Sequence, residues 1–412
     1  MSETVLQSGV RGGFTAAVIG NGIAGAAVAR CLALSAPSHP SKITLYEIGR
    51  GPGGRAATRR SRSLPQMSIN HGAPYADIST PQGLELIRSL GHAIKPYAGR
   101  QAILDANGQM QRSSQQEAGS ELITGHDGEM ASIAASMLCD QKGDRLPAIE
   151  TAYSTMVRGL AKPDGPDSQW HLRDKSGEVI GVADWLIVSG NGIAHPRWSE
   201  IFGGEPPLVE AASVLGDQTL ESALSVIAQQ MAVPVLAVLM HATGGLAQRW
   251  RALELEYLLL QGDPILAKIA IQPTENGECS IVLHSTTDFA LRNRGVYGSS
   301  SSAARVGDAS SDASREGEIV EQMLAALNRL PDMPEADATD YDYGPLLHRW
   351  GNAFPQGPAL PLQKAVCPHS KVAFCGDYVE TPARMGSFEC ALIAGSMVAD
   401  TVINIVEHKN SG

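Results

Sequence analysis

The sequence has little positive charge: 32 lysines and arginines stand against 43 aspartates and glutamates, which gives a net charge of −11. Such a chain repels phosphate backbones, so we expect no nucleic-acid partner. Cysteines are also few, and the six that are present form no C-x-x-C pair. This spacing argues against a zinc site and against a disulfide framework. We therefore expect reduced, mostly buried thiols and no metal centre.

The chain also lacks the features of targeting and membrane segments. Its first thirteen residues contain no hydrophobic core of a secretory signal, so the default expectation is a cytoplasmic protein, with an organelle as the open alternative. The stretch 16–36 is nearly apolar, but Gly20, Gly22 and Gly25 interrupt it and Arg30 lies inside it. This composition predicts no membrane span.

Length and residue pattern predict two domains. At 412 residues the chain exceeds the usual size of a single hydrophobic core. A buried strand, an Ala-rich helix and a second strand begin the chain, and further buried strands and a closing helix follow much later. The expected elements are the strands Phe14–Ile19, Lys42–Tyr46, Trp185–Ser189 and Val372–Cys375 and the helices Ile23–Ser35 and Ser387–Ile405.

These elements indicate an α/β fold in which a Rossmann-like domain is assembled from discontinuous segments. We assign that domain to residues 14–80, 150–195 and 362–408. The remaining segments, 81–149 and 196–361, are expected to form a mixed-sheet substrate domain, because apolar runs at Val233–Met240 and Ser280–His284 are typical of strands.

One segment of the substrate domain has a different composition. Ser299–Glu316 is rich in serine and alanine and has no aromatic residue. A segment with so little apolar surface is typical of a mobile insertion, and it is a candidate contact for a protein partner.

The strongest motif is the turn Gly20-Asn21-Gly22-Ile23-Ala24-Gly25 between the first strand and the first helix. In a G-x-G-x-x-G turn, the first glycine permits the tight bend and the second lets the backbone approach a pyrophosphate. The third allows close packing of helix and strand. Glu47 ends the next strand, where its carboxylate can accept hydrogen bonds from a ribose. Together they predict a dinucleotide site that disfavours a 2′-phosphate.

A second loop adds candidate ligand contacts. Gly51-Pro52-Gly53-Gly54-Arg55 combines glycines, which allow a turn against a ligand, with a guanidinium that suits phosphate oxygens. Its alternative interpretation is a solvated loop, and Arg59, Arg60 and Arg62 fit a solvated face better. His71, in Asn70-His71-Gly72-Ala73, is a candidate for contact with a reacting centre, although a lone histidine is more often structural.

In combination, the GNGIAG turn, Glu47, the GPGGR loop, NHGAPY and the late FCGDYVETPARMGSFECALIAGSMVA segment resemble the renalase-like branch of FAD-dependent amine-oxidase-fold proteins. The resemblance implies noncovalent FAD and flavin chemistry without a protein nucleophile. It implies contacts with FAD from residues at both ends of the chain and in its middle: Gly20, Gly22, Ile23, Ala24, Gly25, Glu47, Gly54, Arg55, Gly72, Ala73, Val157, Gly376, Asp377, Met385, Gly386 and Ser387.

A helix that begins near Gly386 or Ser387 would also direct unpaired N–H groups at the pyrimidine edge of a flavin. In the substrate domain, His348 and Trp350 resemble a family feature that orients a nicotinamide-like ring, and packing is the alternative interpretation. Pro74 departs from the family pattern, because it stands where a glutamine is usual and it has no backbone N–H.

The resemblance implies an oxidase that accepts a hydride from a dihydronicotinamide donor and passes electrons to O₂, giving hydrogen peroxide. Two alternatives stay open at this point, because a fold does not determine a substrate. One is an oxidase or desaturase of an amine or another small metabolite. The other is a flavin-bound assembly or regulatory protein without turnover.

Overall fold

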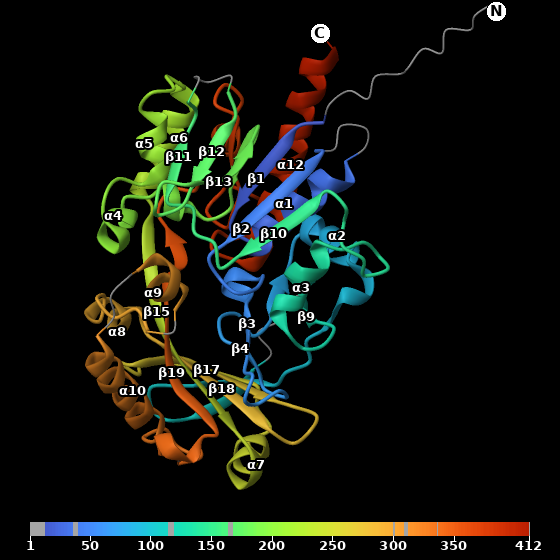
Figure 1. Ribbon diagram of the computed structural model, residues 1–412. Coiled ribbons are helices and arrows are strands. Elements are labelled where there is room, and N and C mark those ends of the chain that lie inside the picture. The colour runs from blue at the N-terminus through green and yellow to red at the C-terminus, as the bar shows by residue number, and fades with distance from the viewer. Residues whose placement is uncertain are drawn as a thin grey trace, which may run out of the picture.

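Two large sheets organise the computed structural model, which describes residues 13–35, 40–113, 119–163, 168–299, 301–308, 312–335 and 337–411 (Figure 1). The first sheet has the strand order β10-β2-β1-β14-β21-β20 and is parallel except for its last pair. Its strands are β1 (Thr15–Ile19), β2 (Lys42–Glu47), β10 (Ile149–Tyr153), β14 (Trp185–Val188), β20 (Val366–Cys367) and β21 (Val372–Phe374).

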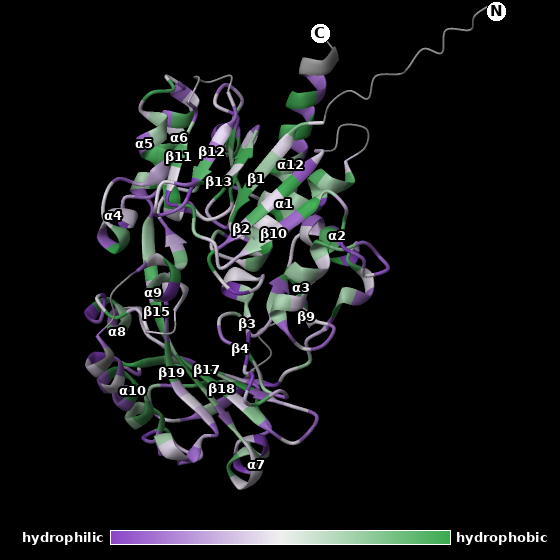
Figure 2. Cartoon of the chain, in the orientation of Figure 1, coloured by the Kyte–Doolittle hydropathy of each residue, from purple (hydrophilic) through white to green (hydrophobic). Residues whose placement is uncertain are grey.

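Helices cover the parallel sheet, which explains why its central strands β1 and β14 are apolar on both faces. The helices α1 (Ile23–Leu34) and α12 (Phe388–Ser411) lie against each other in the core (Figures 1 and 2). Their approach depends on small residues: a Cβ added at Gly395 would lie 2.7 Å from the carbonyl oxygen of Ala24. The strands and helices expected at both ends of this domain are confirmed to within a few residues.

The helix α12 is the one described helix long and apolar enough to cross a bilayer by length and composition, over Phe388–His408. Just over half of that stretch is buried inside the molecule, as in a core helix of a globular fold. The earlier apolar stretch divides into β1, the glycine turn and the 12-residue α1, so it forms no single long helix.

The second sheet is mixed and has the order β19-β15-β18-β17-β16-β7-β8, with one parallel pair, β16 and β7. On one face it packs against α7 (Gly244–Ala252) and α10 (Ala313–Leu327) in a separate hydrophobic cluster. Its strands are β7 (Gln101–Leu104), β8 (Met110–Ser113), β15 (Met231–Ala242), β16 (Tyr257–Leu260), β17 (Leu266–Pro273), β18 (Cys279–Ser285) and β19 (Tyr343–Gln356). The expected α/β class with a Rossmann-like and a mixed-sheet domain is thereby confirmed.

The smaller elements complete the described chain. The further strands are β3 (Thr58–Arg60), β4 (Ser68–Asn70), β5 (Ala76–Ile78), β6 (Ile94–Pro96), β9 (Glu121–Gly125), β11 (Gly159–Ala161), β12 (Trp170–Arg173) and β13 (Val179–Ala183). The further α-helices are α2 (Pro81–Arg88), α3 (Met130–Met137), α4 (Arg197–Phe202), α5 (Pro207–Ala212), α6 (Gln218–Gln229), α8 (Thr287–Arg292), α9 (Ser302–Gly307) and α11 (Leu362–Ala365).

Packing distributes the chain between the two cores differently from the expected domain limits. Within 81–149, only β7 and β8 join the second sheet, whereas α2, β9 and α3 bury Ile87, Ile123 and Ile133 in the larger core around the parallel sheet. The helices α5 and α6 also pack into that core. The sequence pattern did not reveal this, because amphipathic helices carry no mark of the sheet they cover.

The Ser-rich segment also differs from the expectation of an insertion without order. Its described residues form α9 and the first turn of α10. Gly307 is buried, and a Cβ added there would lie 2.5 Å from the ring of Phe202, so α9 packs directly on α4. The carbonyl of Gly307 also accepts a hydrogen bond from Arg158 at 3.3 Å. Residues 300 and 309–311 lie outside the described residues.

Candidate functional site

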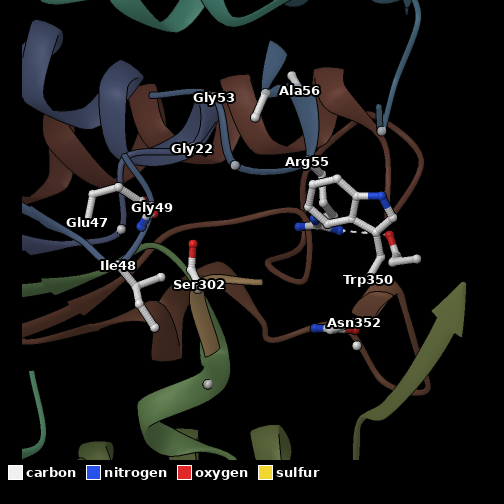
Figure 3. Close-up of a pocket in the computed structure, with 18 of the residues that line it drawn as sticks. Gly22, Glu47, Ile48, Gly49, Gly53, Arg55, Ala56, Ser302, Trp350 and Asn352 are labelled. Atoms are coloured by element: carbon white, nitrogen blue, oxygen red, sulfur yellow. Dashed lines mark hydrogen bonds between the residues drawn. The ribbon is translucent and has the colours of Figure 1, made fainter. Parts of the chain in front are cut away.

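A cavity of about 930 Å³ lies where the two sheets meet. Its lining comes from the carboxyl ends of β1, β2 and β14, from β17, β18 and β19 of the second sheet, and from α4 and the start of α9. Ligands of open α/β sheets bind at the carboxyl ends of parallel strands. Figure 3 shows Glu47 and Ile48 at one end of the cavity and Trp350 near Arg55 at the other.

The glycine turn follows β1 and adopts the conformation that its sequence predicts. Gly20 has φ +100°, and a Cβ there would lie 2.6 Å from Ser189 Oγ. A Cβ on Gly25 would lie 2.1 Å from the carbonyl oxygen of Gly20, so Gly25 allows close helix–strand packing. Gly22 caps α1 without any side-chain hydrogen bond. The N–H groups of the first turn of α1 therefore face the cavity without a capping side chain, as an anion site requires.

The carboxylate of Glu47 is buried beside this turn. Its Oε2 accepts a hydrogen bond from the backbone N–H of Asn21 at 2.8 Å, and its Oε1 accepts one from Gly49 at 2.6 Å. Burial raises the pKa of Glu47, and the two N–H donors oppose this change. Each carboxylate oxygen has a second lone pair, so Glu47 can still accept bonds from a ligand in the cavity that it lines.

The second glycine loop packs on the first through backbone alone. Gly53 donates its N–H to the carbonyl of Asn21 at 2.8 Å and pairs with Gly22 as an isolated bridge. Gly53 and Gly54 have φ of +111° and +55°, and a Cβ on Gly54 would lie 3.1 Å from the Cα of Gly22. Gly54 is therefore required by the contact with the dinucleotide turn, whereas Gly53 is required by the loop's own backbone, because its Cβ would lie 2.9 Å from the carbonyl oxygen of Ala56.

Arg55 and Asp377, which are far apart in sequence, form a bidentate ion pair with N–O distances of 2.5 and 2.6 Å. Arg55 also donates to the carbonyl of Ala353 at 3.0 Å. Burial lowers the pKa of Arg55, but the Asp377 carboxylate raises it by more, so the pKa lies above its ordinary value. The two residues were expected to contact a ligand separately. In the structure they hold each other, and both line the cavity.

Aromatic and imidazole rings gather beyond this ion pair. The Trp350 ring stacks on His71 with centroids 5.1 Å apart, and His348 meets both rings edge-on. Trp350 Nε1 donates to the carbonyl of His71 at 3.2 Å, and the same carbonyl is 3.0 Å from His284 Nε2. Burial lowers the pKa of His71 to about 4 and that of His284 to about 3. These imidazoles are therefore neutral at pH 7.

Lys268 is a lining residue that the sequence analysis missed. It lies on β17 opposite His284 of β18 and points its ammonium towards the Phe354 ring, 5.7 Å from the centroid. Burial lowers the pKa of Lys268 to about 8. A single cation inside the otherwise apolar run LAKIAI was the signal that could have identified it.

The lining carries more positive than negative charge, although the whole chain is acidic. Its two carboxylates, Glu47 and Asp377, are both held by donors of the chain. Among the described residues, several lining cations have no carboxylate within 4 Å: Arg50, Arg59, Arg197, Lys268, Arg305 and Arg349. The cavity therefore favours anionic ligands.

The structure brings most of the expected residues to this one cavity. All of the expected contacts except Gly25 and Met385 line it, including Val157, Gly376 and the ring residues. The N–H groups of Gly386 and Ser387 donate to the carbonyls of Asp377 and Arg384, and that of Cys390 donates to Ser387 Oγ, so these three N–H groups already have partners within the chain. The expectation that the start of this helix directs unpaired N–H groups at a ligand stays a prediction for its first residues, which begin at Phe388. Pro74 is buried outside the lining.

Comparison with known proteins agrees with this architecture. Residues 18–89 match the model of the NAD(P)-binding Rossmann-like domain family. No curated protein matches the sequence. Among solved structures, cyclohexylamine oxidase from Brevibacterium oxydans is 14% identical, with 96% of this chain and 100% of that chain covered and a TM-score of 0.57. A putrescine oxidase is 12% identical, with 95% of this chain and 99% of that chain covered and a TM-score of 0.54. FqzB is 16% identical, with 96% of this chain and 80% of that chain covered and a TM-score of 0.51.

The chain therefore has the two-domain fold of these amine oxidases, in which a Rossmann-like domain carries a mixed-sheet domain. At identities this low, the likeness concerns the fold. The expected resemblance to amine-oxidase-fold proteins is confirmed at that level, and substrate and chemistry rest on the residues of the cavity.

Proposed function

We propose that the protein is a flavoenzyme that binds FAD noncovalently across this cavity. Three features support FAD over a smaller nucleotide. The uncapped start of α1 suits a pyrophosphate, Glu47 suits the adenosine ribose, and the cavity continues past Arg55 to a separate group of rings. Its volume lies at the upper end of the ~300–1,000 Å³ range of ligand sites.

Named residues would hold each part of this cofactor. Gly20, Gly22 and the first turn of α1 would meet the pyrophosphate, and Val157 would lie near the adenine. Gly72 and Ala73 would lie beside the isoalloxazine, where the Ala73 N–H is already bonded to the Arg55 carbonyl at 3.0 Å. FAD would supply a two-electron acceptor that O₂ can reoxidise.

We propose that the donor is a dihydronicotinamide, as in renalase-like proteins, and that the electrons pass to O₂ to give hydrogen peroxide. The observation that carries this proposal is the ring group His71, His348 and Trp350 in a cavity lined by cations. A dihydronicotinamide already carries a transferable hydride, so it needs a planar surface and no acid or base. The indole of Trp350 would provide that surface, because it stacks on the neutral imidazole of His71 and its bond to the His71 carbonyl holds it in place.

An amine is the second candidate, because solved structures of this fold include cyclohexylamine and putrescine oxidases. The charges of this cavity oppose it. A protonated amine would meet Lys268 and unpaired guanidinium groups, and both lining carboxylates already accept hydrogen bonds from the chain. A donor that is neutral or anionic at its reacting end fits the lining better.

Anaerobic stopped-flow reduction of the flavin-loaded protein tests the proposal. We expect 2- or 6-dihydroNAD(P) to bleach the flavin at least tenfold faster than common monoamines, and ordinary 4-dihydroNAD(P)H to be a poor donor. Hydrogen peroxide should form when O₂ is readmitted. Fast bleaching by an amine would overturn the donor assignment. Absence of reduction by every small molecule would favour a flavin-bound assembly protein.

A further inference from the structure

Two arginines of the cavity come from elements outside the dinucleotide turn. Arg197 begins α4 and donates from Nη1 to the carbonyl of Gly351 at 2.8 Å. Arg349 lies on β19, between the ring residues His348 and Trp350 in sequence, with its guanidinium over the Tyr297 ring at 5.0 Å from the centroid. Both residues line the cavity.

The hydrogen bond to Gly351 places the Arg197 guanidinium against the strand β19 that carries Arg349, and the charge of Arg349 disfavours that of Arg197. Burial, and then the charge of Arg349, lowers the pKa of Arg197 to about 10. In the part of the chain that the structure describes, no carboxylate lies within 4 Å of either group, and Glu200 acts on both only at longer range. The Nε atom of Arg349 is buried and has no hydrogen-bond partner among the described residues.

Two other lining arginines, Arg55 and Arg60, are arranged differently. Arg55 is neutralised by Asp377, and Arg60 is neutralised by Glu129 at 2.7 Å. Two neighbouring cations without a counterion are unfavourable unless a ligand provides the anion. Guanidinium groups bind carboxylates and phosphates through paired N–H donors, and both arginines line the cavity in which such a ligand would lie.

We infer that the electron donor carries an acidic group, a phosphate or a carboxylate, and that Arg197 and Arg349 bind it. This inference rests on the proposed oxidase function and adds a substrate class to it. The two arginines are specificity residues, because they would hold a part of the donor that does not react. Binding energy from such a remote group would orient the ring that faces Trp350.

Two donors that differ by one phosphate test the inference. We would compare 6-dihydronicotinamide mononucleotide with its riboside in anaerobic flavin reduction, and obtain the donor Kd from the concentration dependence of the rate. We expect the riboside to bind at least tenfold more weakly. In Arg349→Gln and in Arg197→Gln, this ratio should fall to about one. Arg292 is exposed on α8 and lies outside the cavity lining, so the control variant Arg292→Gln should keep the wild-type ratio of the two Kd values.

A donor-independent measurement separates this inference from the proposed function. Inorganic phosphate and benzoate are titrated into the FAD-loaded protein, and flavin absorbance reports binding. The acidic-group site is supported if phosphate or benzoate binds saturably and if Arg197→Gln or Arg349→Gln weakens that binding at least tenfold. The anion that binds shows whether the site takes a phosphate or a carboxylate. This result stands even if no dihydronicotinamide reduces the flavin. Equal Kd values for the two donors overturn the inference. So does a tenfold rise in the Kd of FAD itself in both variants, because the arginines would then bind the cofactor.

Discussion

Replacing Glu47 with alanine removes an acceptor on which both the chain and the proposed cofactor depend. In the chain, the N–H groups of Asn21 and Gly49 lose their partner. Asn21 is fully buried, so its orphaned donor should cost about 1 to 3 kcal/mol of folding stability. If FAD donates a ribose hydroxyl to the carboxylate, losing that bond should cost a further 1.5 to 3 kcal/mol of binding, or roughly a 10- to 150-fold rise in the FAD Kd.

Asp184 provides a matched control in the same sheet. Its carboxylate accepts hydrogen bonds from the backbone N–H of Thr15 at 2.7 Å and from the Thr15 hydroxyl at 2.8 Å, but it does not line the cavity. Asp184→Ala should therefore lower stability by a similar amount and leave the FAD Kd within about twofold of the wild-type value.

The assay measures FAD affinity by fluorescence quenching at a temperature where both apoprotein variants are folded, and stability by urea unfolding of the apoproteins. The assignment of Glu47 to the ribose fails if the two variants lose FAD affinity to the same extent at equal folded fraction. It also fails if Glu47→Ala loses stability only. Either result would mean that Glu47 merely holds the glycine turn in place.

Three further predictions follow from the structure. Acid or heat should release FAD, rather than FMN or NAD, from the purified yellow protein, and flavin retained on the denatured chain would contradict noncovalent binding. Because burial holds the pKa of His71 near 4 and that of His284 near 3, below the unfolded value near 6.5, each should stabilise the fold above pH 6.5 and lose that contribution as pH falls towards these values. Between pH 6.5 and 4.5, the free energy of unfolding in urea should fall with decreasing pH by up to about 1.4 kcal/mol per pH unit for each histidine. His284→Gln should reduce this slope. Gly307→Ala should lower the melting temperature, because its Cβ would lie 2.5 Å from Phe202, whereas Gly317→Ala in open space on α10 should raise or preserve it; equal effects would show that α9 does not pack as described.

The local parts of the site were predictable from the sequence because their information is local. A tight turn between a strand and a helix requires Gly20, and close packing at that turn requires Gly25. Glu47 ends the next strand, and parallel neighbouring strands place their carboxyl ends at one edge. The turn and the carboxylate therefore follow from a short stretch of chain.

The opposite wall of the cavity could not be derived in this way. Lys268, His284 and Arg349 lie on three strands whose order in the sheet depends on long-range pairing. The ion pair between Arg55 and Asp377 likewise joins positions 322 residues apart. The composition of Ser299–Glu316 wrongly indicated a segment without packing contacts. Gly307 allows close packing on Phe202 although the segment has no large apolar side chain.

The charge of the cavity opposes the charge of the whole molecule, and this contrast bears on how an anionic donor would be recognised. A net charge of −11 repels anions at long range, and physiological salt screens that repulsion beyond about 8 Å. Inside the cavity, screening is weaker, and lining cations such as Arg197 and Arg349 are not neutralised by nearby carboxylates. Selectivity for an acidic donor would therefore arise after entry, where guanidinium groups meet the ligand at hydrogen-bond distance. Raising ionic strength should then alter the donor association rate less than replacing Arg349 alters donor affinity.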